Sequence, residues 1–214
     1  MAARPKPPPP TLVLLVRHGK TPSTGTTLPG RAPGLHLSDD GRRQAEAVAA
    51  RIAALPKVDA VYASPLERTR ETAAPIAAAR GLKVTTTRGL LECDFGEWTG
   101  GELKALSKLP EWTTVQRYPS GFRFPGGESF PEMQQRMVGA IATLAEHHPG
   151  GVVVAVSHAD PIKAYMAHAL GTHLDLFQRI VVSPCSVSAV ALGRGGPVVL
   201  TVNALGDLTE LRPS

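Results

Sequence analysis

The sequence predicts an α/β fold, a three-layer α/β/α sandwich with a mostly parallel central sheet. Apolar runs typical of buried strands alternate with helical stretches along the 214 residues, which is the order that βαβ units produce. The first run, residues 12–16, is apolar at every position, as expected of a strand covered on both faces. We expect one domain over residues 11–214, after a disordered, proline-rich tail over residues 1–10.

A helix is expected after the first strand, because Asp39 or Asp40 can cap its N-terminus and apolar residues follow at helical spacing. Those apolar residues are Ala45, Val48, Ala49, Ile52 and Leu55. Residues 58–63 predict the second strand. A second helix over residues 66–80 should end at Gly81, because glycine commonly terminates helices.

Residues 83–87 are rich in β-branched side chains and predict a third, short strand. The stretch 96–127 is rich in Gly, Pro and Trp, and it predicts an excursion from the sandwich with a lid-like part near residues 100–127. A helix over residues 129–148 follows, with an apolar stripe on one face. The stripe consists of Met133, Met137, Ile141 and Leu144.

The last third of the chain predicts a buried strand, a helix and a hairpin. Residues 152–156 are continuously apolar, as in the first strand. Asp160 as N-cap and Pro161 at the first helical position then predict the start of a helix. Two apolar runs, residues 187–192 and 198–202, flank a glycine-rich turn and predict the hairpin.

The charge and cysteine content exclude several classes of protein. Lys and Arg number 23 against 18 Asp and Glu, a net charge of +5. This modest excess is spread along the chain, so it favours an anionic ligand and does not indicate nucleic acid. The two cysteines, Cys93 and Cys185, are too few for a disulfide framework or a thiolate zinc site. A reducing, cytoplasmic location fits them.

The basic N-terminus, with Arg4 and Lys6, is followed by four prolines and a short apolar run that stops at Arg17. A secretory signal has about 7–15 apolar residues in a helical segment, so we expect none here. No segment approaches the roughly 20 apolar residues of a membrane span, and no membrane partner is expected.

Polar residues follow three of the predicted strands. Arg17 and His18 come directly after the first strand, Arg68 lies shortly after the second, and His158 follows the strand over residues 152–156. Ligands of such sheets bind beyond the carboxyl ends of the strands. We therefore expect both histidines and both arginines to converge on one sheet edge, together with Glu92.

Phosphoryl transfer through a covalent histidine requires this combination. A neutral imidazole attacks a phosphate monoester, guanidinium groups bind its oxygens, and a second, protonated histidine adds a donor. A carboxylic acid protonates the leaving alcohol and then deprotonates the attacking water. Because fixed cations neutralise the phosphate, this chemistry requires no metal and no cofactor.

Five segments, taken in order, resemble the signatures of the histidine phosphatase superfamily, which includes the cofactor-dependent phosphoglycerate mutases. They are Arg17-His18-Gly19, Ser64-Pro65-Leu66-x-Arg68-Thr69, Glu92-x-x-Phe95-Gly96-x-Trp98, Pro125-Gly126-Gly127-Glu128-Ser129 and Ser157-His158. The resemblance spans nearly the whole chain. Residues 174–180 and 115–116 are also similar to an actinobacterial branch of phosphatases or phosphomutases.

The resemblance implies a role for each residue that matches these signatures. His18 matches the phosphorylated nucleophile, and Glu92 matches the proton donor. Arg17, Arg68 and His158 match the phosphate pocket.

The backbone N–H of Ala159, near the start of a helix, is expected to add a donor to the phosphate. Close to this pocket the chain departs from the family pattern. Lys20 stands where Glu or Gln is common, and Thr24 stands where an Asn usually contacts phosphate, so its hydroxyl is a candidate substitute. Ala159-Asp160 replaces the commoner glycine-containing pair.

Several polar residues have simpler interpretations. The Glu-x-x-Phe-Gly spacing selects Glu92 as the acid over three neighbouring carboxylates, Asp94, Glu97 and Glu102. Glu128 is expected to stabilise the N-terminus of the helix after it, and Arg70 to be a helix-surface charge. His147 and His148 are adjacent and do not share a helix face, so no metal site is predicted.

The site and the resemblance together predict a metal-independent phosphatase that hydrolyses a small-molecule phosphate ester through a phosphohistidine at His18. A phosphomutase of the phosphoglycerate mutase type is the alternative, although the excursion looks short for it and paired arginines are not evident. Candidate cations for a second anionic group are Lys104, Lys108, Arg117 and Arg123. A non-catalytic phosphoester-binding module is disfavoured because nucleophile and acid are both present. A homodimer through the terminal strands or residues 172–183 stays open.

Overall fold

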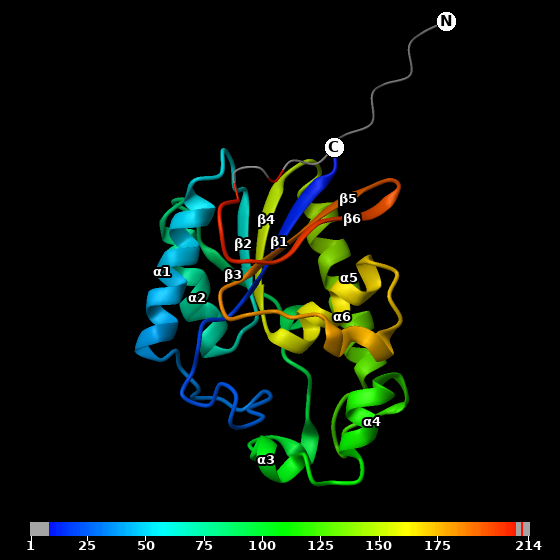
Figure 1. The fold of residues 1–214 in the computed structure, drawn as a ribbon. Coiled ribbons are helices and arrows are strands. Elements are labelled where there is room, and N and C mark those ends of the chain that lie inside the picture. Colours follow the sequence, from blue (N-terminus) through cyan, green and yellow to red (C-terminus); the bar gives the residue numbers. More distant parts are fainter. Residues whose placement is uncertain (1–8, 209–210, 212–214) are drawn as a thin grey trace, which may run out of the picture.

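The computed structural model describes residues 9–208 and 211, and it consists of one mixed sheet with helices on both faces (Figure 1). Its six strands lie in the order β3-β2-β4-β1-β5-β6. β1, β2, β3 and β4 run parallel to one another, and the β5–β6 hairpin adds to β1 in antiparallel pairing. The predicted α/β/α sandwich with a mostly parallel sheet is confirmed.

The strands are β1 (Thr11–Arg17), β2 (Ala60–Ala63), β3 (Val84–Thr86), β4 (Val152–Ser157), β5 (Val187–Gly193) and β6 (Gly196–Ala204). The α-helices are α1 (Asp39–Ala53), α2 (Glu67–Ala78), α3 (Leu103–Leu106), α4 (Trp112–Arg117), α5 (Phe130–His147) and α6 (Ala159–Ala169). The 3₁₀ turns are η1 (Arg88–Leu90), η2 (Gly96–Trp98), η3 (Pro119–Gly121) and η4 (Leu174–Arg179).

β1 is apolar throughout because its two faces enter two different cores. Leu12 and Leu14 pack in the cluster that α1 and α2 cover. Val13 and Leu15 pack in the cluster on the opposite face, with α5 and α6. Since side chains alternate between the faces of a strand, this burial fixes the register of β1 against β4, in which Val13 pairs with Val153.

The excursion over residues 96–127 carries α3 and α4, which lie beyond one end of the sheet (Figure 1). A third apolar cluster joins it to α5, α6 and η4. Its aromatic members include Phe95, Trp98, Phe122, Phe124 and Phe130. This segment is therefore anchored by its own buried core.

The helix starts correct two predictions. Ser38, not Asp39 or Asp40, caps α1, because the Ser38 Oγ accepts from the Gly41 N–H at 3.1 Å. α6 begins at Ala159, so Asp160 lies in its first turn and is not its N-cap. By contrast, α5 begins after Ser129 as the sequence indicates, with a capping box to Glu132.

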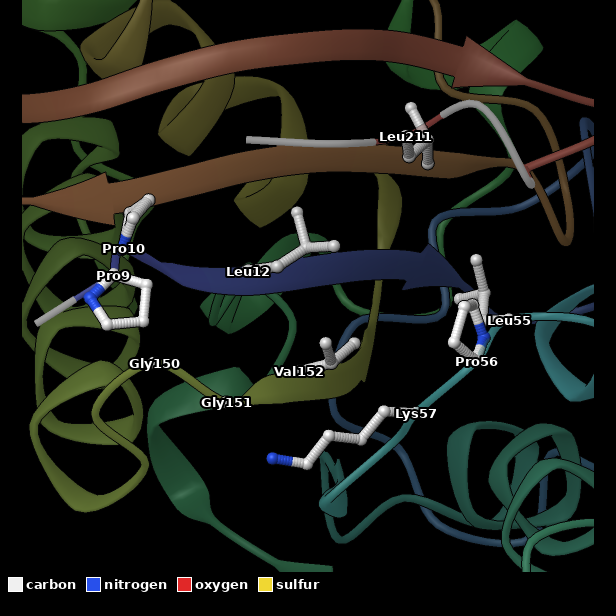
Figure 2. Close-up of a pocket in the computed structure, with 10 residues that line it drawn as sticks. All are labelled: Pro9, Pro10, Leu12, Leu55, Pro56, Lys57, Gly150, Gly151, Val152 and Leu211. Carbon is white, nitrogen blue, oxygen red and sulfur yellow. The ribbon is translucent and has the colours of Figure 1, made fainter. Parts of the chain in front are cut away.

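The opposite end of the sheet, where β1 and β4 begin, holds an apolar pocket of about 250 Å³ (Figure 2). Pro9, Pro10 and Leu211 line it together with Leu12 and Val152. Residues 1–8 of the expected disordered tail lie outside the described residues. In the part of the chain that is described, no helix combines the length and the apolar character of a bilayer span.

Candidate active site

A cavity of about 240 Å³ lies at the carboxyl ends of β1 and β4. Its polar lining comes from three places along the chain: the segment after β1, the loop before η2, and the start of α6. The polar residues that line it are Arg17, His18, Thr21, Ser23, Thr24, Thr27, Glu92, Asp160 and Lys163. The backbone topology thus gathers groups that are far apart in sequence.

His18 follows β1 and is held by backbone contacts. Its N–H donates to the Ser157 carbonyl on β4 at 3.0 Å. Gly19 must lack a side chain, because a Cβ there would lie 2.5 Å from the Gly41 carbonyl oxygen. The His18 Nδ1 donates to the Gly19 carbonyl at 2.7 Å, which leaves Nε2 as the unprotonated ring nitrogen.

Burial and the neighbouring Arg68 and Arg17 lower the pKa of His18 to about 3. The imidazole is therefore neutral at physiological pH, as a nucleophile must be.

His158 lies beside His18, with 5.2 Å between the ring centroids. Its Nε2 is 2.9 Å from the Ser64 hydroxyl after β2. Burial, and next the charge of Arg68, hold the pKa of His158 well below its usual value. Burial among cations thus favours a neutral His158, whereas the sequence analysis expected a protonated one. A neutral His158 still carries one N–H donor.

Arg17 and Arg68 are fixed by carbonyl acceptors. Arg17 Nη1 donates to the Val182 carbonyl at 2.7 Å, and Arg68 Nη2 donates to the Gly30 carbonyl at 2.8 Å. Four buried nitrogens of Arg17, Arg68 and His158 have no hydrogen-bond partner among the described residues: Arg17 Nε, Arg68 Nε, Arg68 Nη1 and His158 Nδ1. Such a group of donors suits an anion, because an unsatisfied buried donor is costly. Arg68 and His158 are fully buried and lie behind the cavity lining.

Glu92 faces the same cavity and is 8% exposed. One carboxylate oxygen accepts from the Cys93 N–H at 2.9 Å, and the other lies 3.9 Å from Nδ1 of His158. Burial, and next the charge of Asp160, raise the pKa of Glu92 to about 7 against the opposing charges of Arg68 and Arg17. A carboxyl group with this pKa exists in both protonation states near neutral pH, as a general acid and base requires.

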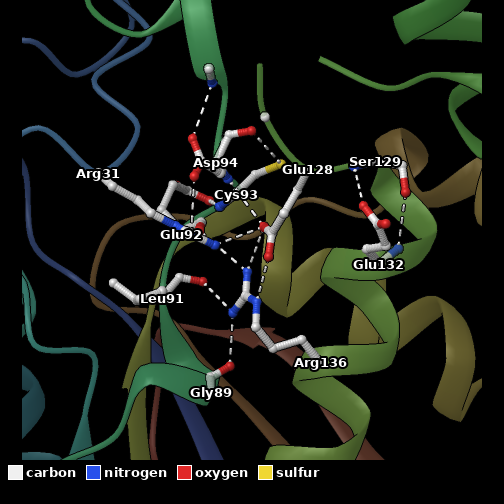
Figure 3. Close-up of polar contacts among 12 residues, drawn as sticks. Arg31, Gly89, Leu91, Glu92, Cys93, Asp94, Glu128, Ser129, Glu132 and Arg136 are labelled. Carbon is white, nitrogen blue, oxygen red and sulfur yellow. Dashed lines mark hydrogen bonds and ion pairs between the residues drawn. The ribbon is translucent and has the colours of Figure 1, made fainter. Parts of the chain in front are cut away.

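An ion-pair network holds the backbone that carries Glu92 (Figure 3). Arg136 on α5 contacts both oxygens of Glu128, at 2.8 and 2.9 Å. The same guanidinium donates to the carbonyls of Gly89 and Leu91, each at 2.9 Å. Arg31 Nε donates to the Glu92 carbonyl at 2.8 Å. Glu128 thus serves this network, and the acidic residue in the first turn of α5 is Glu132.

Thr24 and Ala159, both expected to contact phosphate, line the cavity. The Thr24 hydroxyl accepts from the Thr21 N–H at 2.9 Å and lies 3.0 Å from the Thr21 hydroxyl. Lys20 is exposed and is not among the residues that line the cavity, and Arg70 is exposed as expected.

Asp160 and Lys163 line the cavity from α6, and the sequence analysis did not assign Lys163 any role. The two side chains are three residues apart, so helical spacing from Asp160 was the signal that pointed to Lys163. The four cations expected near a second anionic group, Lys104, Lys108, Arg117 and Arg123, do not line the cavity. Arg123 instead pairs with Glu132 on α5. Among the described residues, no group of three or more His, Cys, Asp or Glu side chains is arranged to hold a metal ion.

The sequence pattern of the histidine phosphatase superfamily, branch 1, matches residues 13–205. Phosphoserine phosphatase 1 of Hydrogenobacter thermophilus is 31% identical over 203 residues, which cover 92% of this chain and 94% of that protein. Probable phosphoglycerate mutase GpmB of Cronobacter sakazakii is 34% identical over 182 residues, 83% of each chain.

The bifunctional protein Rv2228c of Mycobacterium tuberculosis is 34% identical over 203 residues, but this chain spans only 55% of its length. Among solved structures, Bacillus stearothermophilus YhfR superposes with a TM-score of 0.83 at 26% identity, over 93% of this chain and 98% of that one.

Proposed function

The chain belongs to the histidine phosphatase superfamily, and from that premise we infer that it is a phosphatase that hydrolyses phosphate monoesters through a covalent intermediate on His18. The observation that carries this inference is the free, neutral Nε2 of His18 beside four buried donors without a partner among the described residues. The relatives with the words phosphatase and mutase in their names share this family and support the same type of chemistry.

In the first step, the lone pair on Nε2 of His18 attacks phosphorus, and the bond from phosphorus to the leaving oxygen breaks. Glu92, in its protonated form, gives its proton to that oxygen, so the alcohol leaves uncharged. Arg17, Arg68 and His158 donate to the non-bridging oxygens and stabilise the negative charge on the transferring group.

In the second step, water attacks the phosphorus of the phosphohistidine while the Glu92 carboxylate accepts a proton from it. The bond between phosphorus and Nε2 breaks and its electron pair returns to His18. Inorganic phosphate leaves, and both residues regain their starting protonation states.

Hydrolysis is favoured over phosphoglycerate mutation by the cations available in the cavity. A mutase must hold a second anionic group of its substrate, and besides Arg17 the lysine or arginine that lines this cavity is Lys163. Lys163 already pairs with Asp160 at 3.6 Å. The mutase remains the second candidate because the similarity to a probable phosphoglycerate mutase covers most of the chain.

The test is to incubate the protein with a phosphate monoester labelled on phosphorus and to quench during turnover. We expect a protein-bound label that is stable to base and lost in acid, as for a phosphoramidate. His18→Ala should abolish both the label and the hydrolysis of an aryl phosphate, whereas Lys20→Ala, which changes an exposed residue next to it, should keep both. Full activity in His18→Ala would overturn the assignment.

We also propose a cytoplasmic location, supported by Cys93 and Cys185, which are buried thiols without a disulfide. We further propose that residues from 11 onward form a single domain, in which the segment near residues 100–127 covers the active-site cavity. A homodimer is also part of this proposal. No role for nucleic acid is proposed, because the net charge of +5 is modest and spread along the chain.

A further inference from the structure

A second cavity, of about 250 Å³, adjoins the first on the side of the excursion. The two cavities share one wall, formed by Leu28, Phe95, Leu103, Asp160 and Lys163. The remaining lining comes from α4, α5, η4 and the loop before α5, and it consists of Trp112, Val115, Gln116, Phe124, Phe130 and Gln178. We call this second cavity the side chamber.

We propose that the side chamber binds the body of the leaving alcohol, so that the preferred substrates are phosphate monoesters of bulky, uncharged alcohols. This inference rests on the proposed function, because it takes the phosphate to be bound beside His18. Leu28, Phe95 and Leu103 line both cavities, so the two lie side by side. A substrate whose phosphate lies beside His18 therefore extends its alcohol past these side chains into the side chamber.

The aromatic part of the lining of the side chamber is packed in place. Phe124 contacts Phe95 with 4.9 Å between ring centroids and Phe130 with 5.3 Å. Trp112 is stacked on Trp98 at 6.3 Å. Aromatic rings held by one another form a preformed surface, and such surfaces are typical of small-molecule sites. The amides of Gln116 and Gln178 add hydrogen-bonding groups for a hydroxyl or carbonyl.

The charges in the side chamber argue against a charged alcohol. Its charged lining residues are Asp160 and Lys163, whose side chains are 19% and 18% exposed and pair with each other at 3.6 Å. Lys163 Nζ also donates to Gln178 Oε1 at 3.1 Å. A carboxylate or ammonium group on the alcohol would lose its hydration there and would compete with an existing ion pair. An uncharged alcohol has no such cost.

The test compares three alkyl esters whose alcohols have similar basicity: ethyl phosphate, hexyl phosphate and 5-carboxypentyl phosphate. Since chemistry at phosphorus is nearly the same for all three, differences in kcat/KM report binding of the alkyl chain. We expect kcat/KM for hexyl phosphate to exceed that for ethyl phosphate by on the order of 30-fold, from partial burial of the four additional methylenes. We expect kcat/KM for 5-carboxypentyl phosphate to be at least roughly tenfold lower than that for hexyl phosphate, because its carboxylate loses hydration in the side chamber.

Val115→Trp places a ring in the side chamber, because Val115 is buried on α4 and lines it. We expect it to reduce the ratio of kcat/KM for hexyl phosphate to kcat/KM for ethyl phosphate at least about tenfold. Thr113→Trp is the matched control, since Thr113 is exposed on the same helix and should change neither. If Val115→Trp also impairs ethyl phosphate, Gln116→Trp provides the same obstruction from an exposed position.

Equal kcat/KM for ethyl and hexyl phosphate would overturn the inference, as would a hexyl preference that survives both obstructing variants. Preference for the carboxylated ester would overturn the requirement for an uncharged alcohol. If the proposed phosphatase function itself is wrong, the protein will hydrolyse neither these alkyl esters nor an activated aryl phosphate. That result is distinguishable from hydrolysis of all these esters without a preference for hexyl phosphate.

Discussion

His18 and His158 differ in what their ring nitrogens contact, although the two rings are neighbours. Nδ1 of His18 donates to a backbone carbonyl, so Nε2 is free to attack. Nε2 of His158 contacts the Ser64 hydroxyl, and its buried Nδ1 has no hydrogen-bond partner among the described residues. Because neighbouring groups set the tautomer of each ring, we assign the nucleophile to His18 and a donor to the phosphate to His158.

At the scale of single residues, Glu92→Gln tests the acid. We expect it to lower kcat/KM for an alkyl phosphate by roughly 10²–10⁴-fold, the usual contribution of general acid catalysis. An activated aryl phosphate should lose much less, because an aryl oxide leaves without a proton. Glu102→Gln, at an exposed carboxylate of the excursion, is the control and should leave both rates unchanged. Equal impairment of the two esters would remove the acid role from Glu92.

The raised pKa of Glu92 predicts a pH profile. Phosphorylation of His18 needs protonated Glu92, so kcat/KM for an alkyl phosphate should fall as pH rises through about 7. His18 stays neutral down to about pH 3 and imposes no limit in this range. The substrate itself titrates near pH 6, so it adds a second change. Glu92→Gln should keep the change near pH 6 and lose the fall near 7, and a fall that persists would contradict the assignment.

At the scale of elements, α5 connects the sheet to the loop that carries Glu92 (Figure 3). Arg136 is the contact between them, through three backbone carbonyls and Glu128. Burial raises the pKa of Glu128, but hydrogen bonds from Arg136 outweigh it and hold the pKa below its usual value. The Glu128 carboxylate is therefore charged in a half-buried place and depends on its cations, Arg136 and Arg31.

Arg136→Met is expected to lower the free energy of unfolding by about 3 kcal/mol, because it removes one of the two cations that pair with Glu128 and removes donors from backbone carbonyls. Urea unfolding measures this change. Arg117→Met, on the exposed side of α4, should alter the free energy of unfolding by less than about 0.5 kcal/mol. If the two substitutions have equal effects, the network contributes nothing specific.

At the scale of the whole molecule, burial of ionisable groups couples the active site to stability. His18 has a pKa of about 3 when folded against 6.5 as its usual value, and that of His158 is lowered in the same direction. Between pH 3 and pH 6.5 these two histidines bind more protons in the unfolded chain than in the folded one. Lowering the pH in this range therefore lowers the free energy of unfolding. Glu92 acts oppositely between 4.5 and about 7, because its folded form binds the extra proton.

The effect of His18 and His158 on the pH dependence of the free energy of unfolding is larger than the opposite effect of Glu92. Between pH 6 and pH 5 we expect the free energy of unfolding to fall by about 1.4 kcal/mol, the value for one net proton per pH unit. His158→Gln should remove most of this slope, whereas His147→Gln, at an exposed histidine, should leave it unchanged. Urea unfolding at the two pH values gives the comparison, and an unaltered slope in His158→Gln would show that its burial does not couple to pH.

Patterns that depend on neighbouring residues were predictable from the sequence. The apolar run of β1 and the alternation of strands and helices follow from local burial and local hydrogen bonds. The placement of His18 and His158 at one sheet edge followed from the same alternation, because parallel strands end on the same side.

What only the tertiary structure decided depends on contacts between distant segments. Ser38 caps α1 in place of Asp39 or Asp40, and Glu128 pairs with cations from α5 and from the segment after β1. The protonation states of His158 and Glu92 likewise follow from burial and from charges brought together by folding. The sequence by itself determined which chemical groups stand at the strand ends, because the ends of the strands are encoded by local patterns. The order of the strands was decided by long-range pairing, such as that of β1 with β4. The tertiary structure decided the ionisation of these groups and the shape of the space beside them, because both depend on how the distant segments pack.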